Sequence, residues 1–400
     1  MRTDALLASL DTALAADDAA RTARYPGPAI GRQPVHTVYV PADRITADTP
    51  QVWGAAAVAV LDEHGPLAEF APLEERIRAK LATEPIEDLR VDAEDGYGVR
   101  SDDDEDRDVR AAAQAVGAML SGPAAPPFVG LRLKSLEAAT RRRGLRSAEL
   151  FLDTLLAAGP LPPGFRFTLP KVTSVAQVEA MAAVCEALEQ GFGVSGLRFE
   201  IQVETPQAVL GADGRALVAP MITAASGRCA GLHYGTYDYS AALGVAASEQ
   251  SLEHPVADHA KAVMQVAAAG TGVPVCDGST NVLPVGDAAA VEAARRLHAD
   301  LVTRSLRRGF YQGWDLHPGQ LPTRYAATFR FFRDGMQVAA DRLVRWLDRA
   351  DSGVLDEPAT ARALAGYLVR GLDSGALDAA EVVAAGGPDR ATLDRLLTAT

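Results

Sequence analysis

Cysteine is scarce in this chain, with three residues among 400, at positions 185, 229 and 276. Their odd number and the lack of ligand-type spacing argue against a disulfide framework and against a cysteine-based metal site. Cys229 and Cys276 lie in or beside apolar segments, and we interpret them as small buried core residues. This cysteine usage fits a reducing compartment.

Long apolar runs are also missing. No segment approaches the roughly 20 consecutive apolar residues of a membrane-spanning helix. Residues 1–25 carry acidic side chains throughout and lack the continuous apolar core of a secretory signal peptide. We therefore expect a soluble, cytoplasmic protein with no membrane partner.

Basic side chains are outnumbered by acidic ones, 39 to 52, which gives a net charge of −13. This sign of charge argues against nucleic acid as a partner, because its phosphates would be repelled. An anionic small-molecule substrate remains compatible, because a local arginine and a metal ion can reverse the field inside a cleft.

Short β-rich segments alternate with longer helical segments rich in alanine, leucine and arginine. This alternation is typical of βαβ units and a parallel sheet. The expected strands are residues 35–40, 88–93, 128–134, 166–172, 197–203, 230–234, 273–276 and 310–314.

Eight such units predict an α/β fold of the closed (β/α)8 TIM-barrel type, which needs about 250 residues. An open, doubly wound sheet is the alternative, although no GxGxxG motif follows the first strand to support dinucleotide binding. We expect three parts: an N-terminal helix and lead-in (1–34), a TIM-barrel catalytic domain (35–336) and a C-terminal helical extension (337–400). The extension is expected to cap the barrel or to pack on a neighbouring subunit.

The carboxyl ends of the strands are where TIM barrels carry their function. Polar side chains follow the expected strands of this chain at those positions. They are Asp92, Glu94 and Asp95 after the second strand, Arg132 and Lys134 on the third, Lys171 after the fourth, Glu204 after the fifth, Asp238 after the sixth, Ser279 and Thr280 after the seventh, and Asp315 and His317 after the eighth.

Two of these carboxylates form half of a predicted metal site. Glu204 in QVETP and Asp238 in YGTYDYS lie on consecutive barrel units, each just where a strand ends. Mg²⁺ prefers oxygen ligands and usually takes one or two protein carboxylates, leaving its other positions to water and substrate. The pair predicts Mg²⁺, or Mn²⁺, and a small chelating substrate rich in oxygen.

Two charge runs have simpler interpretations. The acidic run at residues 101–108 precedes a helical segment, and acids are favoured at the amino end of a helix. The basic run at residues 140–146 is suited to the phosphates of a CoA-type substrate or to a solvated helix face, and we favour the solvated face.

Six motifs occur in a characteristic order: VDAEDGYG, GLRLKS, LPKVTS, QVETPQAV, YGTYDYSAALG and WDLHPGQ. In this order they resemble the citrate lyase beta-subunit and hydroxy-oxo-acid aldolase family, part of the phosphoenolpyruvate/pyruvate-binding barrel superfamily. The resemblance covers roughly residues 35–325. It implies a Mg²⁺-dependent carbon–carbon lyase on a TIM barrel, in a homo-oligomer that is a trimer or a hexamer.

The resemblance assigns roles by position. It implies that Glu204 and Asp238 bind the metal and that Arg132 contacts the carboxylate or enolate oxygen of the substrate. Such roles suit cleavage of a β-hydroxy carbonyl compound, because an arginine and a metal stabilise the enolate that is left. The complete set of expected site residues is Arg132, Asp95, Lys171 and His317 as catalytic, Arg132, Asp92, Glu94, Ser279, Thr280 and Trp314 as substrate-binding, and Glu204 and Asp238 as metal ligands.

Two departures from the family pattern point to a divergent subgroup. Asp95 stands where the pyruvate-dependent aldolases have histidine, which favours the branch that resembles acyl-CoA lyases. The loop at residues 278–287 and the Gly-Trp-Asp before His317 also depart from the usual pattern.

The sequence thus predicts a lyase for a hydroxy acid or its CoA thioester, with a 2-oxo acid chelated to the metal. The proton-transfer group stays open, with Asp95, Asp315 and a residue from a neighbouring subunit as candidates. The alternatives are a pyruvate-type hydroxy-oxo-acid aldolase and a non-catalytic ligand-binding barrel.

Overall fold

Eight parallel strands close into a barrel in the computed structural model, which describes residues 2–348 and 357–398. The strand order is β7-β6-β5-β4-β3-β2-β1-β8. Between β7 and β8 a bridge joins Cys276 to Gln312, and Asp277 N–H donates to the Gln312 carbonyl at 2.8 Å. The predicted (β/α)8 barrel is confirmed, and the open-sheet alternative is wrong because both edges meet.

Each strand overlaps one of the expected segments. The last two strands are short, and β8 lies toward the C-terminal end of the segment expected for it. The strands are β1 (His36–Pro41), β2 (Asp88–Asp92), β3 (Phe128–Arg132), β4 (Phe165–Leu169), β5 (Phe199–Val203), β6 (Cys229–Tyr234), β7 (Val275–Cys276) and β8 (Gly313–Asp315).

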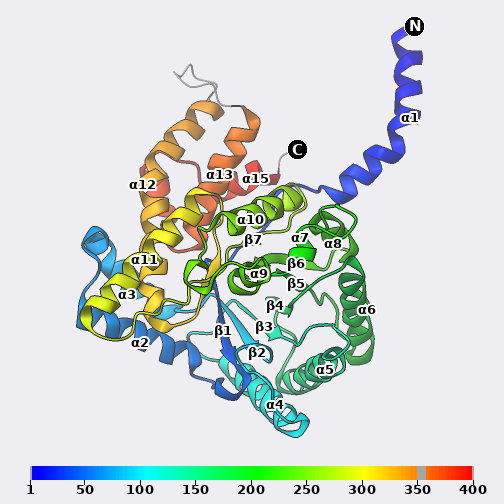
Figure 1. The fold of residues 1–400 in the computed structure, drawn as a ribbon. Helices are drawn as coiled ribbons and strands as arrows, with labels where there is room; N and C mark the ends of the chain where they lie inside the picture. The colour runs from blue at the N-terminus through cyan, green and yellow to red at the C-terminus, as the bar shows by residue number, and fades with distance from the viewer. Residues whose placement is uncertain (1, 349–356, 399–400) are drawn as a thin grey trace.

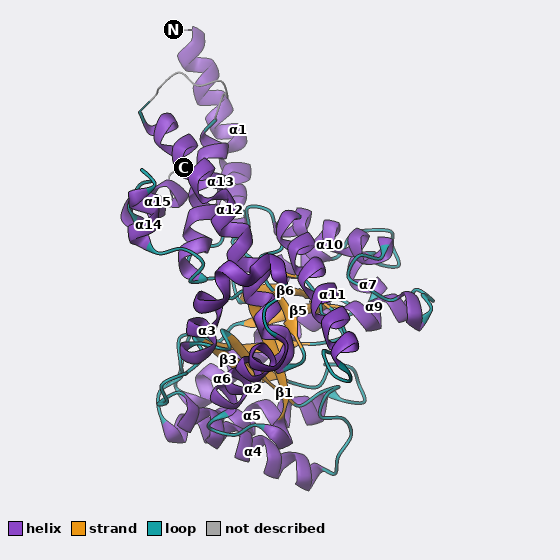
Figure 2. Cartoon of the chain, turned by 90° about the vertical axis from the view of Figure 1, so that its left-hand side faces the viewer, coloured by secondary structure: helices purple, strands orange, loops and turns teal. Residues whose placement is uncertain are grey.

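Helices surround the strands (Figures 1 and 2). The helices of this outer layer are α2 (Thr49–His64), α3 (Glu74–Thr83), α4 (Asp102–Met119), α5 (Arg141–Ala158), α6 (Val175–Phe192), α8 (Val218–Ala224), α10 (Pro255–Ala268), α11 (Ala288–Arg307) and α12 (Leu321–Leu347). Two shorter helices, α7 (Pro206–Val209) and α9 (Thr236–Ala242), follow β5 and β6.

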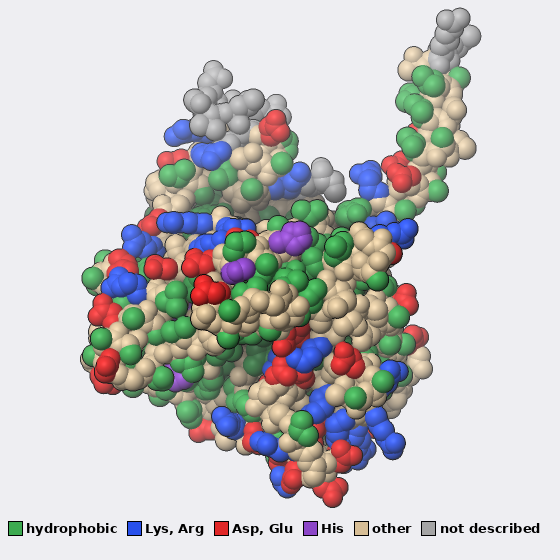
Figure 3. Space-filling view, in the orientation of Figure 1, with side chains coloured by type: hydrophobic (Ala, Val, Ile, Leu, Met, Phe, Trp, Pro, Cys, Tyr) green, Lys and Arg blue, Asp and Glu red, His purple; other side chains and the backbone are tan. Residues whose placement is uncertain are grey.

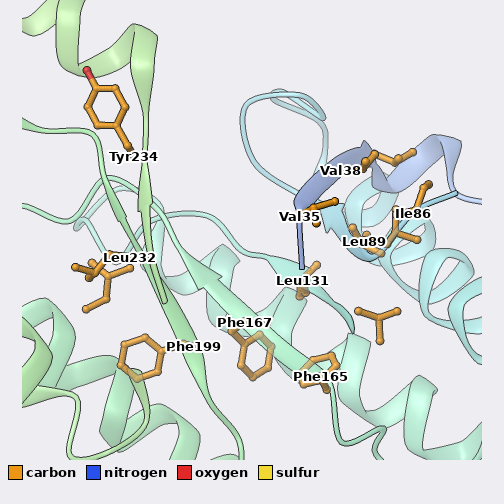
Figure 4. Packing of buried hydrophobic residues seen from close by; sticks show 14 of the residues in the cluster. Val35, Val38, Ile86, Leu89, Leu131, Phe165, Phe167, Phe199, Leu232 and Tyr234 are labelled. Carbon is orange, nitrogen blue, oxygen red and sulfur yellow. The ribbon is translucent and has the colours of Figure 1, made fainter. Parts of the chain in front are cut away.

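The apolar core lies between the barrel and its helices. Alternate strand residues such as Leu89, Phe167 and Leu232 are fully buried there (Figure 4). The residues between them face the barrel interior, which is polar: Arg90 donates to Glu200 at 2.5 Å and to Thr168 at 3.2 Å. Removing Arg90 would leave its buried acidic partners uncompensated, at a cost of about 3–5 kcal/mol.

The acidic and basic runs of the sequence meet each other on the barrel surface. Helix α4 begins at Asp102, and its N-cap Ser101 accepts from the Asp104 N–H at 3.1 Å. Asp106 on α4 pairs with Arg143 and with Arg146 of α5. The basic run is thus engaged by neighbouring carboxylates.

The two ends of the chain extend beyond the barrel (Figure 1). Helix α1 (Arg2–Arg24) projects from the body, and the space-filling view shows hydrophobic side chains along it (Figure 3). At the other end α13 (Pro358–Asp373), α14 (Ala379–Ala384) and α15 (Arg390–Thr398) form the C-terminal appendix. No helix in the described ranges is long and apolar enough to cross a membrane.

Helix α12 continues through the boundary expected at residues 336 and 337 without a break. Its residue Arg333 donates to Glu381 of α14 at 3.0 Å, and Tyr367 of α13 donates to the carbonyl of Phe331. Arg76 of α3 also contacts Asp378, at 2.9 Å. The appendix therefore packs on α12 and α3 of its own chain.

Candidate active site

Five carboxylates and two cationic side chains meet at the carboxyl ends of β2 to β6. They come from the last residue of β2 and the loop after it, from the last residue of β3, from the loops after β4 and β5, and from α9. We call the five acids, Asp92, Glu94, Asp95, Glu204 and Asp238, the carboxylate cluster; the two cations are Arg132 and Lys171.

Arg132 is held by Asp92 on the neighbouring strand. Its Nε and Nη2 donate to the two carboxylate oxygens at 2.7 and 2.5 Å, and Nη1 lies 3.6 Å from Glu94. Burial opposes the charge of Arg132, but the adjacent Asp92 outweighs it and raises the pKa of the guanidinium. Arg132 is therefore a fixed, permanently charged donor at the barrel mouth.

Lys171 stands at the centre of the carboxylate cluster. Its Nζ lies 2.7 Å from Asp238, 2.8 Å from Asp95 and 3.4 Å from Glu94. Burial would lower the pKa of Lys171, but its bonds to Asp238 and Asp95 and the charges of Glu204 and Glu94 outweigh it and raise the pKa. The lysine thus links the loops after β2 and β4 to α9 as a charged ammonium.

The backbone of Lys171 is unusual. Its φ of 51° lies in the left-handed region, which costs a residue other than glycine roughly 1–2 kcal/mol. In this conformation its N–H donates to Glu204 Oε1 at 2.7 Å. One strained residue therefore binds Glu204 through its backbone and Asp238 through its side chain.

Glu204 is buried and tightly surrounded. Gln202 Nε2 donates to it at 3.3 Å, and a Cβ on Gly235 would lie 2.3 Å from the Glu204 Cβ, so only glycine fits there. Burial raises the pKa of Glu204 to about 7, although Lys171 and Arg132 oppose the shift. Burial also raises the pKa of Glu94 to about 7, with the charges of Asp95 and Glu204 adding to it.

The donor set fits a hard divalent cation. Five carboxylates face two cations, and burial raises the pKa values of two of the acids, Glu94 and Glu204. Within residues 2–348 and 357–398 no group of three or more His, Cys, Asp or Glu side chains is arranged as a ready metal centre. Mg²⁺ needs only one or two protein carboxylates, so Glu204 and Asp238 suffice in principle.

A pH dependence follows from the raised pKa values. We expect Mg²⁺ affinity to rise as the pH increases from about 5.5 to about 7.5, because a ligand carboxyl with a pKa of about 7 must lose its proton to bind. The stability of the metal-free protein should depend on pH in the opposite direction. A carboxyl whose pKa is raised by folding stabilises the fold at low pH, and that contribution is lost as the pH rises through the folded pKa of about 7.

Calorimetric titration of Mg²⁺ at several pH values and thermal unfolding of the metal-free protein measure both trends. An affinity that stays constant down to pH 5.5 would contradict this account of Glu204.

His317, an expected catalytic residue, organises its own turn. Its Nδ1 accepts from the Gly319 N–H at 3.0 Å, and Gln320 accepts from the Leu316 and His317 N–H groups. Burial lowers the pKa of His317, so the ring is neutral at pH 7. The structure places His317 in the loop after β8, while the carboxylate cluster lies over β2 to β6.

Ser279 and Thr280, expected to bind substrate, lie in the loop after β7. Thr236 and Tyr237 donate to the carbonyl of Ser279, at 3.3 and 3.4 Å. Gln320 donates to the carbonyl of Thr280 at 3.2 Å. The loop is therefore fixed to the neighbouring β6 and β8 units.

Asp315 does not face the site, so its place among the proton-transfer candidates is wrong. His36 on β1, His298 on α11 and Arg324 on α12 bind its carboxylate at 2.8, 3.0 and 2.9 Å, on the outer side of the barrel. Because strand residues alternate in direction, the preceding Trp314 faces inward.

Three inward-facing residues near the site were missed by the sequence analysis: Tyr39, Gln202 and His233. The ring of Tyr39 lies 4.7 Å from the Arg132 guanidinium carbon and 4.7 Å from the Trp314 ring. Gln202 could have been found, because it lies two residues before Glu204 on the same strand face.

Comparison with known proteins identifies the family. The chain belongs to the family described as "Domain of unknown function (DUF6986)", whose model matches residues 14–399. A comparison with curated proteins found no match.

Solved structures share the fold. A citrate lyase from Burkholderia xenovorans has a TM-score of 0.58 at 19% identity, over 90% of this chain and 97% of that chain. CitE from Mycobacterium tuberculosis, in complex with magnesium, acetoacetate and coenzyme A, has a TM-score of 0.51 at 18% identity, over 87% and 98%. Malate synthase from Haloferax volcanii, as a magnesium/glyoxylate complex, has a TM-score of 0.52 at 15% identity, over 91% and 88%.

These likenesses confirm the predicted resemblance at the level of the fold. The chain has the same barrel fold as these citrate lyase, CitE and malate synthase structures. By their names, the similar proteins are a lyase and a synthase.

Proposed function

We propose that this protein is a Mg²⁺-dependent carbon–carbon lyase that cleaves or forms a hydroxy acid, or its CoA thioester, through an enolate. The observation that carries the proposal is the joining of Glu204 and Asp238 through Lys171, beside a charged Arg132, at one end of the barrel. The magnesium complexes of the similar CitE and malate synthase barrels support the choice of metal.

Glu204 and Asp238 would hold the metal, which when bound supplies a Lewis acid and a template for a chelating 2-oxo acid. Arg132 donates to the oxygen on which negative charge develops, and Asp92 keeps it oriented. Lys171 retains its proton and balances the charge of the acids around it. It is therefore a positioning cation and not the base.

Glu94 is the best-placed group for proton transfer. Its pKa of about 7 lets it exchange a proton near neutral pH, which is what a general acid or base requires. Its oxygens lie 3.4 Å from Lys171 and 3.6 Å from Arg132, between the two cations of the site. Asp95, one of the predicted acid–base groups, is instead kept ionised: burial acts against its charge, but the bond from Lys171 outweighs burial and lowers its pKa.

In this proposal residues 35–336 form the catalytic barrel, residues 1–34 its N-terminal lead-in and residues 337–400 its C-terminal extension. A homo-oligomer, trimer or hexamer, is proposed from the family resemblance.

A substrate panel tests the activity. With Mg²⁺ we expect retro-aldol cleavage of members of a panel that contains hydroxy-oxo acids, malyl-CoA and citramalyl-CoA, and we expect EDTA to abolish it. Release of the 2-oxo acid is followed with a coupled dehydrogenase. Cleavage of free acids with no dependence on CoA would favour the hydroxy-oxo-acid aldolase over the acyl-CoA lyase. Failure to cleave any member, with Mg²⁺ bound, would favour the non-catalytic ligand-binding barrel.

A further inference from the structure

The side chain of Lys171 forms ion pairs with three members of the carboxylate cluster. Its Nζ lies 2.7 Å from Asp238, 2.8 Å from Asp95 and 3.4 Å from Glu94. The acids come from the loop after β2 and from α9, and the lysine comes from the loop after β4. The carboxylates therefore converge on the ammonium group from separate elements, as ligands converge on a bound cation.

Both proposed metal ligands are engaged by this one residue. Asp238 Oδ2 accepts from the Lys171 ammonium, and Glu204 Oε1 accepts from the Lys171 backbone N–H at 2.7 Å. Mg²⁺ binds its oxygen ligands directly, at about 2.0–2.1 Å. A metal ion that takes both carboxylates must therefore compete with the ammonium for Asp238.

Two cations cannot share Asp238 without cost. The ammonium of a lysine is charged at neutral pH, and it repels a dication more strongly in a partly buried site than in water, because the effective dielectric constant is lower there. Arg132 does not compete in this way, because its guanidinium is bound to Asp92 at 2.7 and 2.5 Å. Lys171 is therefore the cation that metal binding has to move.

The ammonium can leave Asp238 without repacking of the core. The side chain of Lys171 is 27% exposed, and those of Asp95 and Asp238 are 54% and 49% exposed. The charged tip thus lies on the solvent side of the cluster, at the end of a flexible four-carbon stem. A ligand carboxylate at the barrel mouth would give it a new partner.

We propose that Lys171 couples the binding of the metal to the binding of the substrate. In the free protein its ammonium holds Asp238 and weakens the binding of Mg²⁺. When a 2-oxo acid binds with the metal, the ammonium moves from Asp238 to the carboxylate of that acid. This inference rests on the proposed function and adds to it an order of assembly, in which metal and substrate bind together.

Titration of Mg²⁺ measures the competition. Removal of the ammonium in Lys171→Met should raise Mg²⁺ affinity by about tenfold or more, because the charge that repels the metal is gone. Lys171→Arg keeps the charge and should bind Mg²⁺ no more tightly than the wild type. Isothermal titration calorimetry gives these affinities without turnover.

Pyruvate, a 2-oxo acid with one carboxylate, tests the transfer of the ammonium. In the wild type, saturating pyruvate should raise Mg²⁺ affinity, and by linkage Mg²⁺ should raise pyruvate affinity by the same factor. In Lys171→Met this factor should fall at least about threefold, because no ammonium passes from Asp238 to the carboxylate.

Lys134 offers a matched control. It is also a partly buried lysine at the end of a barrel strand, but its Nζ pairs with Glu105 of α4 at 2.6 Å and donates to the Ala93 carbonyl at 2.7 Å. Lys134→Met should therefore leave both the Mg²⁺ affinity and the effect of pyruvate as they are in the wild type.

A second variant keeps the test decisive if Lys171→Met folds poorly. Lys171 has a φ of 51°, a region in which glycine is unstrained. Lys171→Gly removes the ammonium and keeps the backbone N–H that binds Glu204. It should show the same gain in Mg²⁺ affinity, and thermal unfolding without metal verifies that each variant is folded.

The inference and the proposed function fail in different ways. If the wild type binds Mg²⁺ and the folded variants bind it equally or more weakly, the coupling role of Lys171 is overturned and the proposed function stands. A gain in affinity with an unchanged effect of pyruvate overturns the transfer of the ammonium to the substrate. Failure of the wild type and all variants to bind Mg²⁺ overturns the proposed function and the inference with it.

Discussion

Replacing Glu204 with glutamine should lower Mg²⁺ affinity by about a hundredfold or more and remove metal-dependent cleavage. The amide keeps the shape of the side chain but lacks the charge that a hard cation requires. Glu204 is also the buried member of the proposed metal pair, so water cannot easily replace it as a ligand. Isothermal titration of Mg²⁺ into wild type and variant measures the effect.

The Glu204→Gln variant should still fold. At pH 8 the metal-free variant should be at least as stable as the wild type, because folding no longer buries a carboxylate whose pKa is raised to about 7. Glu75→Gln, at an exposed position of α3, is the matched control and should bind Mg²⁺ as the wild type does. If Glu204→Gln binds Mg²⁺ as tightly as the wild type, the metal site has been misassigned.

Replacing Arg132 with lysine should reduce kcat by about 10²–10³-fold, the usual effect of losing a preorganised donor to a developing oxyanion. Lysine keeps the charge but cannot bind both oxygens of Asp92 and still present a fixed donor to the substrate. Mg²⁺ affinity should change little, because Arg132 is not among the proposed metal ligands.

Steady-state kinetics together with Mg²⁺ titration separate the two roles. Arg146→Lys, in an exposed ion pair with Asp106, is the matched control and should retain full activity. A loss of Mg²⁺ binding in Arg132→Lys would show that the arginine supports the metal site and not the enolate.

Most of the fold was predictable from the sequence. Apolar segments of strand length alternate with helical segments, and this pattern predicted a barrel. All eight strands of the structure overlap the segments expected for them. The order of the motifs then placed Arg132, Glu204 and Asp238 at strand ends, and in a parallel barrel those ends share one face. The proximity of these residues follows from topology alone.

The rest depended on details that a sequence pattern does not contain. Trp314 and Asp315 are adjacent, and only the register of the short strand β8 decides which of them faces inward. The central position of Lys171 depends on one left-handed backbone angle. The contact between Tyr39 and Arg132 crosses from β1 to β3, strands that are not neighbours in the sheet.

Because α12 is continuous, the folding of the appendix depends on that of the barrel. The helix starts beside the turn of His317 and, at 1.5 Å per residue, extends about 40 Å to the C-terminal helices. Beyond the expected boundary Ala339, Ala340 and Leu343 are still buried. A chain shortened at residue 336 would lose the second part of α12, the helix that the barrel and the appendix share. The remaining barrel would expose to water apolar side chains that the appendix normally covers. Any dissection of this protein into a minimal catalytic unit therefore has to keep the whole of α12 with the helices that cover it.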